Sequence, residues 1–582
     1  MFAAPSRRFS LLFLLMAAAA VSGCSRPAPP ADSKGPEATA VNAETEGEKC
    51  RKKLAAAIRR LDPQSLSLQE NPERSINGLN AWIASCAADD MAELTVSEAT
   101  LKMLDDNPRV TAGRFTVADA NYIRDCLLLR DLTTSVWIRT SSDGQGIGNE
   151  AARVISLFHW LVRNVSLMRP DEQRVPVGLF DVLLTGRGTA EDRAWIFVEA
   201  LRQQHIHTTF VVQPNGDPEA EGDLLATAPW LVVVVLEDGS MLFDPATGVA
   251  VPSADAASTA PAGITALRQH SRWKDSQIRL VTQVSAFAPR MLILQNQLAA
   301  EDSAVFYEEL TGGVSEITPL IDLAVKAGDG LWTKDDVDVW TYPEERSVSA
   351  LAYSEEQQQA HALLMRPFDA PFERKVFSSK SMEELTTVPE ELSPEERRRL
   401  TQQRLMDNFI KMNQSSEEMF GKPSRGLLKA RIQQILGDTD SGVIPQLQQI
   451  RIASMQESIQ VAVPEEIQKE IGMPPLLTIP FPQLIREVNE SSTGDSLYWT
   501  AMCQVDQGDV GAAITTLMNY RRLYPDGKWK YPSLMNQATA LQTQGRAADA
   551  KAVLEQADEA ANPEQSRVRF LLAELAEEQP EA

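Results

Sequence analysis

Two stretches of this 582-residue chain decide its fold: GRGTAEDRAWIFVEALR at residues 186–202 and APWLVVVVLEDGSMLFDPAT at residues 228–247. In the first stretch, Thr189 is a suitable helix N-cap, and Asp192 places negative charge in the first turn, where the helix dipole favours it. Apolar residues then recur at helical spacing, which predicts a helix of about four turns with one buried face. This face consists of Ala194, Phe197, Val198 and Leu201.

The second stretch predicts two strands joined by a tight turn. Residues 231–236 form an almost unbroken β-branched run, which is typical of a buried strand. Residues 237–240 read EDGS and predict a hairpin turn, so residues 241–243 form the returning strand. Residues 208–212 predict another strand directly after the helix. A helix packed on an antiparallel sheet is an α+β arrangement, which is the fold class that we expect.

These blocks resemble the core of the transglutaminase-like family, a branch of the papain-like cysteine enzymes. The family pattern is Gly-x-Cys-x-Asp-x-Ala at a helix start, then His-Ala-Trp on a strand, then a strand ending in Asp-Pro-Thr. Segments 155–164 and 177–184 also resemble the helices that lead into this core, so the resemblance covers residues 150 to 250. The residues that fit the pattern are Gly188, Asp192, Ala194, Phe197, Trp230 and the run Phe243-Asp244-Pro245.

The family resemblance implies a Cys-His-Asp triad, of which this chain keeps one member. Ala190 stands at the cysteine position and Ala228 at the histidine position, so only Asp244 remains. Methyl groups at both places remove the nucleophile and its general base, and we therefore expect no catalytic residue. The resemblance implies a scaffold or a peptide-binding module instead. The possible binding cleft consists of Thr189, Ala190, Asp192, Trp230 and Asp244.

Two other interpretations of these residues stay open. A hydrolase or transamidase with a rebuilt active site would need a new nucleophile, and Thr189 lies next to the vacant position, although N-capping is its ordinary role. His205 and His207 alternate at a strand start and could share a metal ion, but a lone His-x-His lacks further placed ligands. We expect no metal site and no cofactor.

The overall charge of the chain narrows the classes of partner. The net charge is −24 and the isoelectric point is near 4.8, which argues against nucleic-acid binding, because that function needs basic patches. Hydrophobic residues make up 43% of the chain, enough for sizeable cores. The long apolar run lies at the N-terminus, so we expect no membrane span in the mature chain.

Residues 1–23 predict an export signal. Two arginines precede the apolar run at residues 11–21, which is short for a transmembrane helix. This run ends in the sequence VSGC, which resembles the bacterial lipobox, and the resemblance implies lipid attachment at Cys24. Because Ser25 follows, it also points away from retention at the inner membrane. We therefore expect a lipid-anchored envelope protein, held at the outer membrane and facing the periplasm.

The remaining composition suggests how the chain is divided. Proline, alanine and glutamate dominate residues 24–48, which predicts a disordered tether. The expected domains that follow are a helical region (49–140), a transglutaminase-like domain (141–290), a mixed α/β region (291–420) and an α-helical repeat region (421–582).

Three cysteines fall in the first helical region: Cys50, Cys86 and Cys126. In an oxidising envelope, two of them could form a disulfide, and we favour Cys50–Cys86 because each lies on a short helix that could pair antiparallel. The alternative is three buried free thiols.

The C-terminal region contains a repeat at residues 501–525 and 538–563. Gly508 matches Gly545, and each copy ends in a proline. This pattern resembles tetratricopeptide repeats, and Gly437 is a candidate marker of an earlier, decayed copy. Such helix pairs form grooves for partners, so we expect a protein or peptide partner through the repeats or the cleft, besides membrane contact through the lipid. The alternative is a cap that packs only on its own chain.

Overall fold

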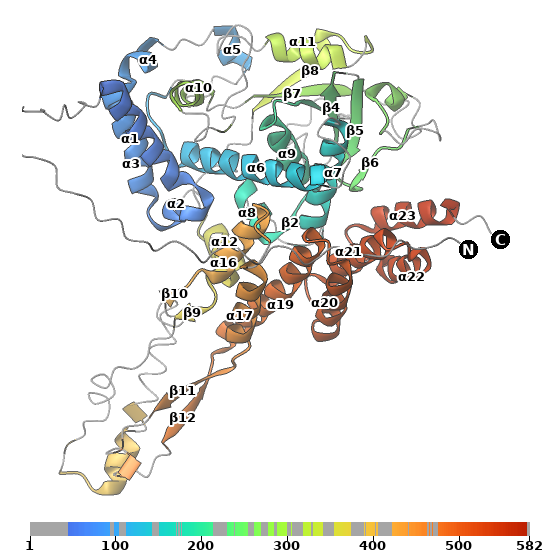
Figure 1. Cartoon of the computed structure of the whole chain (residues 1–582). Coiled ribbons are helices and arrows are strands. Elements are labelled where there is room, and N and C mark those ends of the chain that lie inside the picture. Colours follow the sequence, from blue (N-terminus) through green and yellow to red (C-terminus); the bar gives the residue numbers. More distant parts are fainter. Residues whose placement is uncertain are drawn as a thin grey trace, which may run out of the picture. The chain divides into compact units, whose positions relative to one another are not determined.

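The helix and the strands expected between residues 189 and 244 are present in the computed structural model (Figure 1). The helix is α9 (Ala190–Arg202), and the strands are β3 (His207–Val212), β4 (Trp230–Leu236) and β5 (Gly239–Asp244). β4 and β5 form the expected hairpin, and β3 pairs with the other side of β4. The chain is therefore a mixed α+β protein, and it ends in a helical region.

The structure describes most of the chain between residues 45 and 578. The described residues are 45–93, 98–103, 112–142, 150–169, 172, 175, 177–212, 230–237, 239–253, 261–268, 278–284, 288–298, 304, 318–327, 330–341, 354–373, 389, 391–401, 403–404, 422–439, 442–462, 465, 468–469 and 475–578. The predicted export signal, the predicted lipidation residue Cys24 and Ala228 lie outside them. Of the predicted tether, residues 46–48 belong to helix α1 (Glu46–Leu61).

A six-stranded sheet forms the centre of the α/β core, with the strand order β6-β5-β4-β3-β7-β8. The added strands are β6 (Val249–Ala250), β7 (Arg279–Val284) and β8 (Val337–Thr341). Neighbouring strands are antiparallel, except that β7 and β8 are parallel. β8 follows the domain boundary expected at residue 290, so the sheet extends across that boundary and joins the two regions.

The side chains of β4 alternate between two hydrophobic cores. Val232 and Val234 lie in the core that contains α9, whereas Leu231 and Val233 lie in a second core with α11 (Thr318–Ala327). Both faces of this strand are therefore buried, which is the physical reason for its continuous apolar sequence.

Helices at the start of the described chain build the expected N-terminal helical region. They are α1, η1 (Pro63–Ser65), α2 (Ser67–Glu70), α3 (Pro72–Cys86), α4 (Ala88–Glu93), α5 (Glu98–Met103) and α6 (Val117–Ser142). A disulfide joins Cys50 on α1 to Cys86 on α3, which confirms the pairing favoured from the sequence. Cys126 and Cys503 are buried free thiols.

Removing this disulfide is expected to lower the free energy of unfolding by about 2–4 kcal/mol, because the bridge restricts a long loop of the unfolded chain. The measurement is urea unfolding of a Cys50→Ser/Cys86→Ser variant beside the wild type. A reductant should lower the stability of the wild type and leave the variant unchanged. Equal reductant sensitivity of both proteins would contradict the assignment.

Apart from the C-terminal helices, the other described elements are helices, 3₁₀ helices and short strands. They are α7 (Glu150–Asn164), β1 (Ser166–Leu167), α8 (Leu179–Thr185), β2 (Arg187–Gly188), η2 (Ile264–Arg268), α10 (Ala288–Gln297), η4 (Lys334–Asp336), α12 (Glu355–Met365), η7 (Arg366–Asp369), β9 (Phe372–Glu373), β10 (Lys422–Pro423), β11 (Ser458–Ala462) and β12 (Leu476–Pro480). β1 and β2 form a parallel ribbon directly before α9. β9 pairs with β10, and β11 pairs with β12.

An ion pair between α12 and α8 predicts a pH-dependent contribution to stability. Nε2 of His361 lies 3.2 Å from Oδ2 of Asp181, and this hydrogen bond raises the pKa of His361 above its ordinary value. A histidine whose pKa is raised on folding contributes stability below its unfolded pKa, and this contribution is lost as the pH rises through the folded pKa. We therefore expect His361→Gln to cost more stability at about pH 5.5 than at about pH 8.5, in urea unfolding at both values. An equal cost at both values would contradict the pairing.

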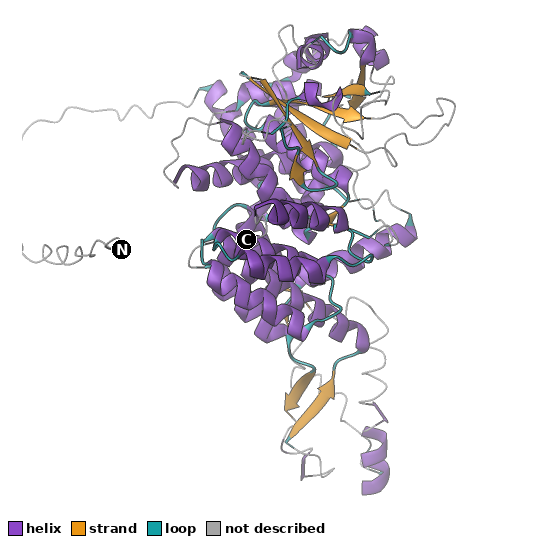
Figure 2. Ribbon diagram, turned by 90° about the vertical axis from the view of Figure 1, so that its right-hand side faces the viewer, coloured by secondary structure: helices purple, strands orange, loops and turns teal. Residues whose placement is uncertain are grey.

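The C-terminal helices stack in chain order, each on the next (Figures 1 and 2). They are α16 (Gly426–Ile435), α17 (Val443–Ser454), α19 (Gln483–Asp506), α20 (Val510–Leu523), α21 (Lys530–Thr543), α22 (Ala547–Ala557) and α23 (Gln565–Glu578). None of the helices in the described part of the chain is long and apolar enough to cross a membrane.

Three helix pairs in this stack turn at equivalent glycines. Gly437, Gly508 and Gly545 have φ values of 83°, 78° and 70°, a left-handed conformation that favours glycine. Each glycine N–H donates to the carbonyl three residues earlier, and the next N–H donates to the carbonyl five residues before itself. The turn at Gly437 therefore has the same local structure as the turns at Gly508 and Gly545, which supports the earlier copy suggested by the sequence.

Candidate functional site: a cleft between the core and the repeats

The N-terminus of α9 is closed by a capping box. The Thr189 hydroxyl accepts a hydrogen bond from the Asp192 N–H at 3.1 Å, and the Asp192 carboxylate accepts one from the Thr189 N–H at 2.7 Å. A Cβ at Gly188 would lie 2.9 Å from Val182 and 3.0 Å from the Asp192 carboxylate, so this close approach requires glycine. Ala190 is the first residue of the helix. Thr189 and Asp192 thus serve the helix start, as the sequence predicts.

Asp244 serves a turn at the end of β5. Its carboxylate accepts hydrogen bonds from the N–H groups of Ala246 and Thr247, at 2.9 and 3.1 Å, and the residue is buried. The carbonyl of Pro245 accepts a hydrogen bond from Arg193 on the first turn of α9. The register of β4 and β5 also brings the start of β4 to this end of the sheet. The start of α9, the start of β4 and the end of β5 therefore meet there, although the side chain of Trp230 lies outside the described residues.

A buried ion pair fastens the repeats to this corner of the core. Arg193 is fully buried and donates to the carbonyl of Val165 at 2.7 Å and to the carboxylate of Glu564, which precedes α23. Glu564 also accepts from the Leu167 N–H at 3.1 Å and from Arg567 at 3.1 Å. Burial would raise the pKa of Glu564, but the two arginines hold it below its ordinary value. Residues 371 positions apart in the chain therefore form one charged contact.

A second buried junction holds α19 and α16 against α8. The guanidinium of Arg431 lies 3.5 Å from the ring centre of Trp499 and donates to the carbonyls of Leu183 and Leu184, at 2.7 and 3.2 Å. Burial lowers the pKa of Arg431 to about 9. A Cβ at Gly186, whose φ is 64°, would overlap the Trp499 ring. Glycine at this position therefore permits the close packing of the repeat helix on the core.

The inner helices of the repeats face their own chain. Asp506 on α19 forms an ion pair with Arg163 on α7, and Asn536 on α21 donates to the carbonyl of Arg163 at 3.4 Å. Trp499 packs on Gly186, as described above. These contacts occupy a face of α19 and α21. This face packs on its own chain, as the alternative stated from the sequence has it.

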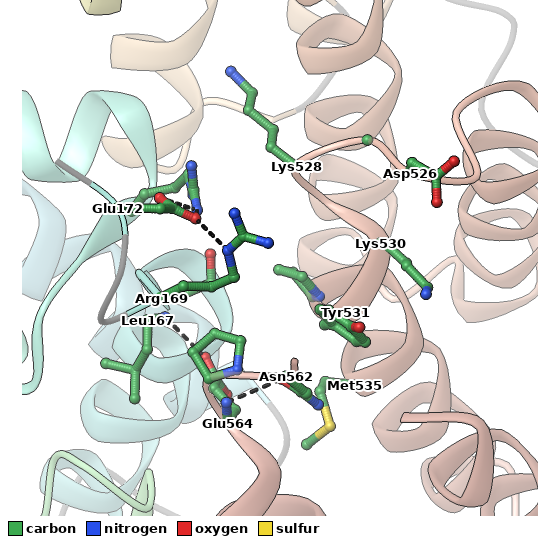
Figure 3. A pocket seen from close by; sticks show the side chains of 15 residues that line it. Leu167, Arg169, Glu172, Asp526, Lys528, Lys530, Tyr531, Met535, Asn562 and Glu564 are labelled. Atoms are coloured by element: carbon green, nitrogen blue, oxygen red, sulfur yellow. Dashed lines mark hydrogen bonds and ion pairs between the residues drawn. The ribbon is translucent and has the colours of Figure 1, made fainter. Parts of the chain in front are cut away.

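A cleft of about 370 Å³ remains between the repeats and the core (Figure 3), within the usual size range of ligand pockets. One wall comes from β1, the residues that follow it, and β2; the other comes from the turn before α21, the first turns of α21 and the turn before α23. The core wall consists of Ser166, Leu167, Arg169, Glu172 and Arg187. The repeat wall consists of Asp526, Gly527, Lys528, Lys530, Tyr531, Pro532, Met535, Asn562, Pro563 and Glu564.

Ion pairs order the charged side chains of both walls. Both carboxylate oxygens of Glu172 accept from Arg187 at 2.7 Å, and Nε of Arg169 lies 3.4 Å from the same carboxylate. On the repeat wall, Lys528 lies 2.8 Å from Asp495, and Lys530 lies 3.1 Å from Glu559. The cleft therefore carries charges of both signs. Its cations are Arg169, Arg187, Lys528 and Lys530, and its carboxylates are Glu172, Asp526 and Glu564.

The cleft differs from the set of residues expected from the sequence. Arg187 lies two positions before Thr189, so the cleft borders the predicted site, but Thr189, Ala190, Asp192 and Asp244 do not line it. The sequence carries no motif for the residues that do line it, because they come from segments that are far apart in the chain. Lys528 and Lys530, which follow the repeat proline Pro525 within a few residues, were a local signal.

The described free thiols are poorly suited to nucleophilic chemistry. Burial raises the pKa of Cys126 to about 12 and also raises the pKa of Cys503. Both thiols therefore stay protonated near neutral pH, whereas a thiolate is the reactive form. Among the residues that the structure describes, no three His, Cys, Asp or Glu side chains are grouped as a metal site would require.

Comparison with known proteins identifies one part of the chain. Residues 495–527 match the tetratricopeptide repeat family, and this match spans the end of α19 and all of α20. No curated protein and no solved structure matches the chain. Repeats of this family generally mediate contacts between proteins. The chain therefore carries a tetratricopeptide-type repeat in its C-terminal helical region.

Proposed function

We propose that this chain is a lipid-anchored protein of the bacterial cell envelope that holds a polypeptide partner in the cleft between its core and its repeats. The observation that carries the binding role is the cleft itself, one wall of which belongs to the C-terminal helical region. The segment of this region that matches the tetratricopeptide repeat family contributes Asp526 and Gly527 to the wall. Contacts within the chain fill a face of α19 and α21, whereas the cleft is a concave surface of the described repeats that a ligand can reach.

We further propose that the core is a transglutaminase-like domain without catalytic activity. The meeting of the α9 start, the β4 start and the β5 end at one end of the sheet supports this assignment, because the family arrangement requires it. Ala190 supplies no nucleophile, and both Thr189 and Asp244 are engaged with backbone N–H groups. This domain acts as a scaffold that carries one wall of the cleft.

Site-specific photo-crosslinking tests the binding role. Benzoylphenylalanine in place of Tyr531, inside the cleft, should crosslink to a polypeptide partner in intact cells. The same group in place of Asn519, on the exposed face of α20, is the matched control and should give no such product. If both positions give the same products, or if the cleft position gives none, the proposed function is wrong.

Detergent phase partitioning tests the anchor. The wild type should enter the detergent phase, and Cys24→Ser should stay in the aqueous phase if the lipid is attached there. A wild type that is water-soluble after processing would contradict the proposal.

Turnover assays test the absence of catalysis. We expect no thiol-dependent transamidase or peptidase activity, and treatment with iodoacetamide should leave partner binding unchanged. Amide-bond turnover that persists in Thr189→Ala and disappears in Asp244→Ala would establish a rebuilt hydrolase or transamidase site instead.

A further inference from the structure

The turn between α20 and α21, residues 524–529, forms part of the repeat wall of the cleft. Asp526, Gly527 and Lys528 line the cleft, whereas Trp529, at the end of the turn, is buried. Figure 3 shows Lys528 on the repeat side of the cleft, across from Glu172 on the core wall. The position of this turn therefore helps to set the shape of the cleft.

Asp495 on α19 holds the turn from inside the repeats. Its side chain is 1% exposed, and its carboxylate accepts a hydrogen bond from the Trp529 indole at 2.7 Å. The Lys528 ammonium lies 2.8 Å from one oxygen of the same carboxylate and 2.9 Å from the other. A buried carboxylate needs such donors because it has lost its water. Asp495 thus supports a wall of the cleft without lining it.

Aromatic residues confine the same turn. The Tyr498 ring stacks on the Trp529 ring at a centroid distance of 4.2 Å, and the Tyr520 hydroxyl accepts a hydrogen bond from the Trp529 backbone N–H at 3.1 Å. A Cβ at Gly527 would overlap the Tyr520 hydroxyl and lie 2.9 Å from Cβ of Tyr524. A wall that is fixed before a ligand arrives loses little conformational entropy on binding.

We infer that Asp495 is a positioning residue for partner binding, which keeps the turn at residues 526–529 in the conformation that the partner meets. This inference rests on the proposed function and adds to the site a residue that does not touch the ligand. Without the Asp495 carboxylate, the Trp529 indole loses its acceptor, and Lys528, whose side chain is already 33% exposed, is released to water. The turn then populates other conformations, and the apparent affinity falls with the fraction of chains that keep the binding conformation.

Photo-crosslinking in intact cells, with benzoylphenylalanine at position 531, tests the inference. Asp495→Ala should reduce the yield of the partner crosslink per chain roughly tenfold, in proportion to the binding-competent fraction. Asp495→Asn keeps an oxygen for the Trp529 indole and should give an intermediate yield. Hydrogen exchange of the purified full-length chain should become faster at residues 524–529 in Asp495→Ala and stay unchanged in β4.

Ser492→Ala is the matched control. Ser492 is a fully buried polar residue on the same helix, and its hydroxyl donates to the carbonyl of Pro367 in η7 at 3.0 Å, away from the cleft. Its removal costs a buried hydrogen bond, so this variant has a structural defect of its own but should retain the wild-type crosslink yield. If Asp495→Ala does not accumulate in cells, Asp495→Asn replaces it, with a smaller expected loss in the same direction.

The outcomes separate the inference from the proposed function. A wild-type crosslink yield in Asp495→Ala, or unchanged hydrogen exchange at residues 524–529, would overturn the positioning role and leave the binding role standing. Equal losses in Asp495→Ala and Ser492→Ala would assign the effect to general destabilisation and also overturn the inference. The absence of any crosslink from position 531 in the otherwise unchanged chain would count against the proposed function itself.

Discussion

Arg431→Met is expected to lower the free energy of unfolding by about 3–5 kcal/mol, the usual cost of removing one member of a buried charged network. Arg431 is fully buried and donates to the carbonyls of Leu183 and Leu184 at the end of α8. Methionine fills similar space but donates no hydrogen bond. Each buried carbonyl left without a donor lowers the stability by about 1–3 kcal/mol. Loss of the guanidinium contact with the Trp499 ring adds to this cost. Urea unfolding of the full-length chain gives the measurement.

Two further variants make this result specific. Lys429→Met changes an exposed cation on the same helix and should shift the stability by less than about 0.5 kcal/mol. Arg431→Lys should remain strongly destabilised, because an ammonium cannot hold both carbonyls and lie flat on an indole. Wild-type stability of Arg431→Met would show that this junction does not hold the repeats to the core.

Glu564→Ala is expected to cost about 3–5 kcal/mol, because it leaves the fully buried Arg193 without its carboxylate. The Leu167 N–H loses its acceptor as well. Since Glu564 connects the repeats to the core, amide hydrogen exchange should become faster in β1 and at the start of α23 before it does in the central sheet. Hydrogen exchange with mass spectrometry measures this order directly.

A double-mutant cycle checks the pairing. Arg193→Met combined with Glu564→Leu removes both charges and should be less destabilised than the sum of the single variants by about 1 kcal/mol or more. Glu555→Ala, an exposed acidic residue on α22, is the control and should be nearly neutral. Additive effects of the two core substitutions would show that Arg193 and Glu564 do not depend on each other.

Several local features could be predicted because their causes lie within a few residues. The capping box needs only Thr189 and Asp192, three positions apart, and the strand at residues 231–236 needs only its own β-branched run. The turns at Gly508 and Gly545 follow from the left-handed conformation that glycine tolerates. The Cys50–Cys86 bridge spans 36 residues, and the sequence only favoured it, because each cysteine lies on a short helix that could pair antiparallel.

The cleft and its supports could not be predicted in this way. Arg193 sits in a stretch that reads as an ordinary amphipathic helix, and nothing beside it points to Glu564, 371 residues away. Arg431 likewise donates a hydrogen bond to the carbonyl of Leu184 on α8, which lies 247 residues earlier in the chain. Burial of such charges depends on the packing of the core against the repeats, which no short window of sequence contains.

The sequence by itself therefore determined the elements: the capped helix, the β-branched strands, the bridged helices and the glycine turns of the repeats. The tertiary structure decided which surfaces those elements leave open. In the tertiary structure, a face of the repeat helices packs on the core, and the cleft beside Arg169 stays open. The physical reason is that local sequence patterns depend on the conformation of the backbone. A cleft depends instead on which distant side chains lie beside each other after the apolar surface is buried.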